Sequence, residues 1–113
     1  MSGYKLTVRR GPRVTREKFD DLDAAIAALE QHAKEIRTAG PVEPRKMLRE
    51  FEPEDQVAGR VEISTGGLIR RGEDAGVDVM GDGTIVAFRG GMRRTELDPG
   101  STGPFDAVRR ALS

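Results

Sequence analysis

Apolar and polar side chains alternate at the start of the chain. Residues 4–10 place Tyr4, Leu6 and Val8 on one side and polar or basic residues on the other, which is the period of a half-buried strand. A Gly-Pro pair follows and marks a turn. Residues 13–19 then return as a second strand, so the pattern predicts an N-terminal β-hairpin that is rich in basic residues.

The spacing of apolar residues then changes to threes and fours, which is the period of an amphipathic helix. The helix is predicted over residues 21–38, with Asp20 as its N-cap and Asp23 in the position of a capping box. Gly40 and Pro41 end it. We expect its apolar stripe to pack on a sheet. The stripe consists of Leu22, Ile26, Leu29, Ala33 and Ile36.

Strand-like alternation resumes in the second half of the chain. It is weak over residues 46–52, before a predicted turn at 52–55, and clear over residues 56–64. Residues 66–74 carry glycines and charged residues and are predicted to form a loop. The residues expected on the apolar side of the 56–64 strand are Val57, Gly59, Val61 and Ile63.

The strongest hairpin signal lies further along the chain. A Gly-Asp-Gly sequence at 81–83 separates the apolar residues 77–80 from residues 84–88, and Asp-Gly favours a tight turn between two strands. Residues 92–97 continue as a short strand. Residues 104–112 form a short helix with a proline at its first position, where the missing N–H costs nothing.

Together these elements predict an α+β fold. It consists of a small antiparallel sheet in the order ββαββββα, with one long helix packed on one face and a short C-terminal helix. We expect residues 1–113 to form a single domain, because a chain of this length buries enough surface for one core.

Composition excludes several classes of site. The chain has no cysteine, which excludes disulfides, a thiolate nucleophile and cysteine-ligated metals. No apolar run approaches the ~20 residues of a membrane span, and the first residues lead into a strand without the apolar core of a signal peptide. The expectation is a cytoplasmic protein that does not bind membrane. Basic and acidic residues number 19 each, so no overall field attracts a polyanion.

The candidate catalytic and metal-binding residues have simpler explanations. His32 is the only histidine, and the sequence shows no partner for it. The acids at 20–23 suit a helix N-terminus. Those at 73–82, in which Asp78 and Asp82 are interpreted as exposed, lack the spacing of a calcium loop. The glycines match no nucleotide-binding motif. We therefore predict no catalytic residue, no metal, no cofactor and no enzymatic activity.

The arginines carry the clearest binding signal. They outnumber lysines 15 to 4 and form adjacent pairs at 9–10, 70–71, 93–94 and 109–110. Charge alternates in sign along the chain, which favours pairing within the domain. Arginines gathered at one edge of a sheet would instead suit phosphate contacts, whereas few aromatics are available to stack on single-stranded bases. The residues assigned to this nucleic-acid hypothesis are Arg9, Arg10, Arg13, Arg16, Arg93 and Arg94.

One resemblance points the same way. The basic stretch Lys-Leu-Thr-Val-Arg-Arg at 5–10, the return strand at 13–19 and the segment Asp-Asp-Leu-Asp-Ala-Ala-Ile-Ala-Ala-Leu-Glu at 20–30 follow one another. In this, residues 4–38 resemble the small sheet-then-helix domains at the N-termini of tyrosine recombinases. The resemblance implies a basic sheet that lies in a DNA groove.

Without a catalytic constellation, the sequence predicts a domain that acts through its surface. The favoured hypothesis is a non-enzymatic protein-interaction or assembly module, including a homodimer, because an open antiparallel sheet has edges that can pair. The alternative is a nucleic-acid-binding accessory protein that uses the N-terminal hairpin and the arginine pairs. A second alternative is a small-molecule-binding domain with a pocket between sheet and helix.

Overall fold

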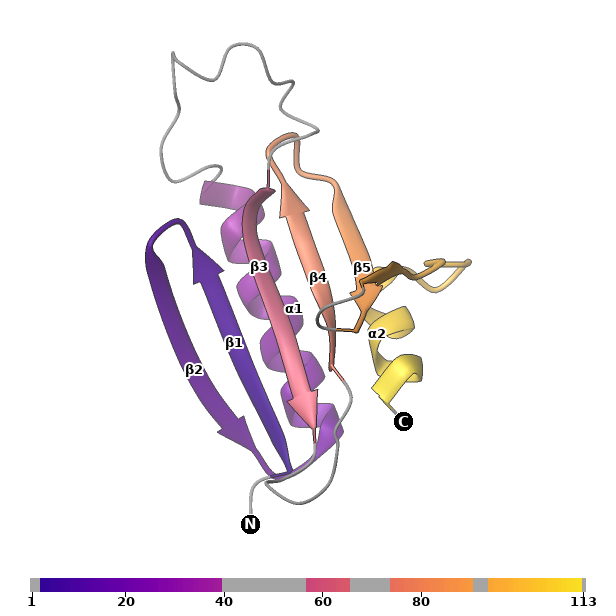
Figure 1. Cartoon of the computed structure of the whole chain (residues 1–113). Coiled ribbons are helices and arrows are strands. Elements are labelled where there is room, and N and C mark those ends of the chain that lie inside the picture. Colours follow the sequence, from indigo (N-terminus) through magenta and orange to yellow (C-terminus); the bar gives the residue numbers. More distant parts are fainter. Residues whose placement is uncertain (1–2, 40–56, 66–73, 91–93, 113) are drawn as a thin grey trace.

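A six-stranded antiparallel sheet with two helices forms the fold in the computed structural model, which describes residues 3–39, 57–65, 74–90 and 94–112 (Figure 1). The helices are α1 (Leu22–Ala39) and α2 (Pro104–Leu112). The predicted α+β class, with a long helix on the sheet and a short C-terminal helix, is confirmed. The strands are β1 (Tyr4–Arg10), β2 (Arg13–Phe19), β3 (Val57–Thr65), β4 (Asp74–Met80), β5 (Ile85–Arg89) and β6 (Thr95–Glu96).

The strands lie in the order β2-β1-β3-β4-β5-β6, and each neighbouring pair is antiparallel. The chain leaves β2 at one edge, crosses the sheet as α1 and enters β3 on the far side of β1 (Figure 1). The first strand of the chain is therefore an interior strand. Within the described ranges, β2 and the short β6 are the two edges of the sheet.

One face of the sheet is apolar because neighbouring strands bring their apolar positions into register. Leu6 lies opposite Ile63, and Val8 lies opposite Val61, which in turn lies opposite Val77. Both helices pack on this face and share one core with it. The predicted apolar stripe of α1 supplies much of that core, with Leu22 at its margin. The buried residues of α1 are Ala25, Ile26, Leu29, Ala33 and Ile36.

The opposite face, hereafter the polar face, carries the alternate residues of the same strands. A strand directs successive side chains to opposite sides, so the register of the sheet assigns these positions. They are Lys5, Thr7, Arg9, Val14, Arg16, Lys18, Arg60, Glu62, Ser64, Asp74, Gly76, Asp78, Val86, Phe88 and Glu96.

Helix α1 begins one residue later than predicted, and its N-cap is Asp21 rather than Asp20. The Ala24 N–H donates to Oδ1 of Asp21 over 2.7 Å, which satisfies one of the unpaired amides in the first turn. Asp23 forms no capping box, because its carboxylate pairs with Arg109 of α2. Two adjacent aspartates gave the sequence pattern no means of choosing between them.

We expect Asp21→Ala to lower the free energy of unfolding by about 1 kcal/mol, the usual cost of losing an N-cap. Urea unfolding followed by circular dichroism measures the change. Asp20→Ala is the matched control, since it removes the same charge from the neighbouring residue and leaves the cap in place. Equal losses in the two variants would contradict the assignment of the cap.

The third and fourth strands differ from their predicted form. Ala58 is an extra residue in β3, because Val57 lies opposite Met80 and Gly59 lies opposite Val79. This β-bulge breaks the alternation, and Val57 is 47% exposed instead of facing the core. Strand β4 begins at Asp74, within the predicted loop, because residues 74–76 pair with β3 on one side and, from Ala75, with β5 on the other.

Two hairpin turns have the geometry that their glycines favour. Gly11 has a φ of 59° and precedes Pro12 in the two-residue connection between β1 and β2, as a type II′ turn requires. In the turn between β4 and β5, Gly83 has a φ of 94° and donates its N–H to the Met80 carbonyl oxygen over 2.9 Å. That pattern is a type I turn closed by a glycine bulge, and it confirms the predicted hairpin.

The C-terminal part follows the sequence pattern closely. Strand β6 lies inside the range 92–97, and Pro104 is the first residue of α2. The strand expected at 46–52 and the turn at 52–55 lie outside the described residues. Neither helix of the described part has the length and apolar character needed to cross a membrane.

Candidate nucleic-acid interface

The polar face of the N-terminal hairpin is basic. Lys5 lies opposite Lys18, and Arg9 lies four pairs further along the ladder, with Arg16 on β2 two pairs from each end. All four side chains are exposed. They share a face because they occupy alternate positions of two antiparallel strands. These four residues are hereafter the basic hairpin face.

Little negative charge opposes this face. The Glu62 Oε1 atom on β3 lies 3.9 Å from Nε of Arg9, at the outer limit of an ion pair. For Lys5, Arg16 and Lys18, no carboxylate of the described residues lies within ion-pair distance. Their charge is therefore directed to solvent.

The one acid of the hairpin points to the other side of the sheet. Glu17 alternates with Arg16 and Lys18, and its Oε1 lies 2.9 Å from Nε2 of His32 on α1. The His32 Nδ1 atom lies 3.6 Å from Oε1 of Glu35. The sequence analysis missed Glu17 because only the fold brings β2 near α1, whereas Glu35 lies three residues from His32 on the same helix.

The six residues of the nucleic-acid hypothesis do not form one cluster. Arg9 and Arg16 belong to the basic hairpin face. Arg10 and Arg13 lie opposite each other beside the turn, on the helix side of the ladder. The Nε atom of Arg10 is buried and has no hydrogen-bond partner. Arg93 lies outside the described residues.

Arg94, the remaining member of that set, lies near the opposite edge of the sheet. One of its guanidinium nitrogens donates to Oδ2 of Asp78, while Nε of Arg60 donates to Oδ1 over 2.6 Å. Both guanidinium groups lie over the ring of Phe88, with their Cζ atoms 4.2 Å and 5.4 Å from its centroid. Such contacts are attractive because the ring face is electron-rich. Arg60, Asp78, Phe88 and Arg94 are hereafter called the arginine–aspartate cluster.

Asp78 is therefore buried rather than exposed, with 5% of its surface accessible. The sequence correctly separated Asp78 from its apolar neighbours on β4, but it did not show that two arginines cover the carboxylate. Asp82 has a different role, in the turn before β5. It accepts the Thr84 N–H over 2.9 Å, which lowers the pKa of its carboxyl group.

The arginine pair at 109–110 is also matched by acids. Arg109 pairs with Asp23 across the two helices, and this contact raises the pKa of the guanidinium. Arg110 pairs with Asp106 one turn away on α2. These arginines and Arg94 are thus spread over the fold and sit beside acids, so they add little to a common basic patch.

Among the described residues, no aromatic ring is exposed on the polar face. Phe88 is 1% exposed under the two guanidinium groups, and Tyr4 and Phe19 pack against the core. Bases of a single strand would find no ring to stack on among these residues. The charge of the basic hairpin face is consequently its main chemical feature.

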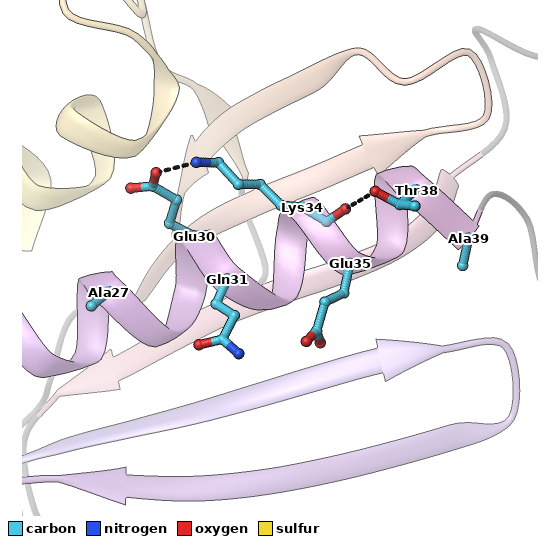
Figure 2. A pocket seen from close by; sticks show the side chains of 7 residues that line it. All are labelled: Ala27, Glu30, Gln31, Lys34, Glu35, Thr38 and Ala39. Carbon is cyan, nitrogen blue, oxygen red and sulfur yellow. Dashed lines mark hydrogen bonds and ion pairs between the residues drawn. The ribbon is translucent and has the colours of Figure 1, made fainter.

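A concave region formed by described residues lies on the exposed side of α1 (Figure 2). It is shallow, and Lys34 crosses it to pair with Glu30 over 2.7 Å. Between α1 and the sheet, where the second alternative places a small-molecule pocket, buried apolar side chains form the core cluster. The residues that line the shallow region are Ala27, Glu30, Gln31, Lys34, Glu35, Thr38 and Ala39.

In the part of the chain that the structure describes, no three potential metal ligands gather around one point. His32 lies on α1, Asp78 on the polar face and Asp82 in the turn before β5. Comparison of the chain with protein-family models, curated proteins and solved structures gives no match.

Proposed function

We propose that this domain binds double-stranded nucleic acid through the basic hairpin face, without catalysing a reaction. The observation that supports the proposal is the set of four exposed cations on one side of β1 and β2, with a single distant carboxylate beside them. A chain of zero net charge would gain little from such a concentration of like charges unless an anion offset their repulsion.

The spacing of these cations suits a phosphate backbone. A strand rises about 3.3 Å per residue and neighbouring strands lie about 4.8 Å apart, so the four charges spread over a surface roughly 13 Å long. Duplex DNA carries one negative charge per about 1.7 Å of its axis. The face can therefore meet several phosphates at once, as a row of long side chains on a rigid ribbon.

A duplex suits this face better than a single strand. Recognition of single strands combines positive charge with exposed aromatic rings, and Phe88 on the polar face is covered by Arg60 and Arg94. Backbone contacts carry no sequence information in themselves. The proposed binding is consequently of low sequence specificity.

We expect the logarithm of the binding constant to fall with the logarithm of salt concentration at a slope of about −3 to −4, because each neutralised phosphate contributes about −0.9. Fluorescence anisotropy of a labelled duplex at several salt concentrations measures the slope. Arg16→Gln and Lys18→Gln should each reduce its magnitude by about 1. Lys34→Gln, which removes the same charge from the exposed side of α1, should leave it unchanged.

Two results would count against the proposal. One is duplex binding that is independent of salt. The other is an equal loss of affinity in Lys34→Gln and Arg16→Gln, which would show a general charge effect rather than a defined face.

A further inference from the structure

We propose that the edge of β2 accepts an extended acidic segment of another protein as an added antiparallel or parallel strand. This proposal does not rest on duplex binding, because it uses the backbone along the edge rather than the side chains of the polar face alone.

Strand β2 has the properties of a pairing edge. It pairs with β1 along its whole length, from Arg13 opposite Arg10 to Phe19 opposite Tyr4, without a bulge. On its other side no strand of the described residues pairs with it. The residues from Arg13 to Lys18 are all exposed. Such an edge leaves every second N–H and C=O free to pair with an incoming strand.

The basic side chains on this edge favour an acidic partner strand. Arg13, Arg16 and Lys18 lie on it, and the carboxylate of Glu17 is occupied by His32 on the helix side. Basic side chains protect an edge from other basic strands, because like charges on neighbouring strands repel. A second copy of this chain would bring the same basic edge. An acidic strand turns that repulsion into attraction.

The alternation of β2 also defines a pattern for the partner. On the polar face the edge presents Val14, Arg16 and Lys18, and on the helix side it presents Arg13, Thr15 and Glu17. Cross-strand neighbours share a face of the sheet. An acid at every second residue would place carboxylates beside Arg16 and Lys18, whereas acids at consecutive residues would direct half of them toward Glu17.

The test uses two fluorescein-labelled peptides of equal composition, one alternating (Thr-Glu-Thr-Glu-Thr-Glu-Thr) and one with its three glutamates in a block. We expect the full chain to bind the alternating peptide about tenfold more tightly. Hydrogen exchange should show new protection of β2 amides. Methylation of alternate backbone nitrogens on the edge-facing side of the peptide should abolish both effects, since it removes the donors of the ladder.

A charge exchange gives a second, independent arm. The exposed double variant Arg16→Glu with Lys18→Glu should lose the acidic peptide and gain the corresponding peptide with lysine in place of glutamate. Binding of the lysine-containing peptide would show that the double variant is folded. Arg109→Glu on α2 serves as the control and should keep the acidic preference.

Equal binding of the alternating and block peptides would overturn the proposal, as would binding that survives backbone methylation. Self-association through β2 in light scattering, abolished by Arg16→Glu, would assign the edge to a second copy and overturn it too. If the peptides fail while salt-dependent duplex binding persists, this proposal falls and the proposed function stands.

Discussion

Gly76→Ala is expected to lower the free energy of unfolding by about 3 kcal/mol or more, at the upper end of overpacking costs. A Cβ atom at this position would lie 2.3 Å from the Val61 carbonyl oxygen and 2.5 Å from the Cα atom of Glu62. Both belong to the backbone of β3, so relief requires β3 and β4 to separate. Phe88 lies opposite Gly76 on β5, on the other side of β4 from this contact.

Urea unfolding followed by circular dichroism measures this loss, with two other glycine variants beside it. Gly3→Ala should be neutral, since nothing lies within 4 Å of the added atom. Gly59→Ala should be intermediate, because its shortest contact, 2.8 Å, is with the end of the flexible Ile36 side chain. A Gly76→Ala protein as stable as Gly3→Ala would show that the close approach of β3 and β4 is wrong.

Asp78→Asn should lower the free energy of unfolding by about 2–3 kcal/mol. Removing one partner of a buried ion pair costs about 3–5 kcal/mol, because the other charge is left without compensation. Here the cost is smaller, since the side chains of Arg60 and Arg94 are 29% and 35% exposed and keep some contact with water. The neutral side chain would leave two guanidinium groups close together above Phe88.

A double-mutant cycle checks this explanation by urea unfolding. In the Asp78→Asn background, Arg94→Gln should cost little or restore stability, because it removes one of the two uncompensated charges. Asp20→Asn, at an exposed position, should change stability by less than about 0.5 kcal/mol. Strictly additive losses in the cycle would mean that Asp78 and Arg94 do not interact.

The sequence predicted the elements that local patterns determine. Alternation gave β1 and β2, and the glycine-containing turns marked the hairpins because Gly11 and Gly83 occupy conformations that few other residues adopt. The helical stripe gave α1 to within one residue at each end. In each case the signal lies within a short window of the chain.

The missed features depend on partners far away in the sequence. Ala75 and Gly76 have weak strand propensity, and pairing with β3 and β5 overrides it. The arginine–aspartate cluster joins β3, β4, β5 and the residue before β6, so no local motif announces it.

For the candidate interface, alternation was enough to place Lys5 with Arg9 on one side of β1 and Arg16 with Lys18 on one side of β2. The register of β1 with β2 was needed to bring the two pairs to the same face. Arginine count alone was misleading, since Arg94 shares the carboxylate of Asp78 with Arg60, and Arg109 pairs with Asp23.

The interior position of β1 has a consequence for how the protein folds. The hairpin and α1 are close in sequence and can form early. The hydrogen-bonding groups on one side of β1 then stay unpaired until β3 docks. That ladder joins Arg9 to Arg60 and Tyr4 to Thr65, so a long loop must close before its contacts are gained. The slow step of folding should therefore be the docking of β3, and the half-formed hairpin–helix unit is the species most prone to mispair until then.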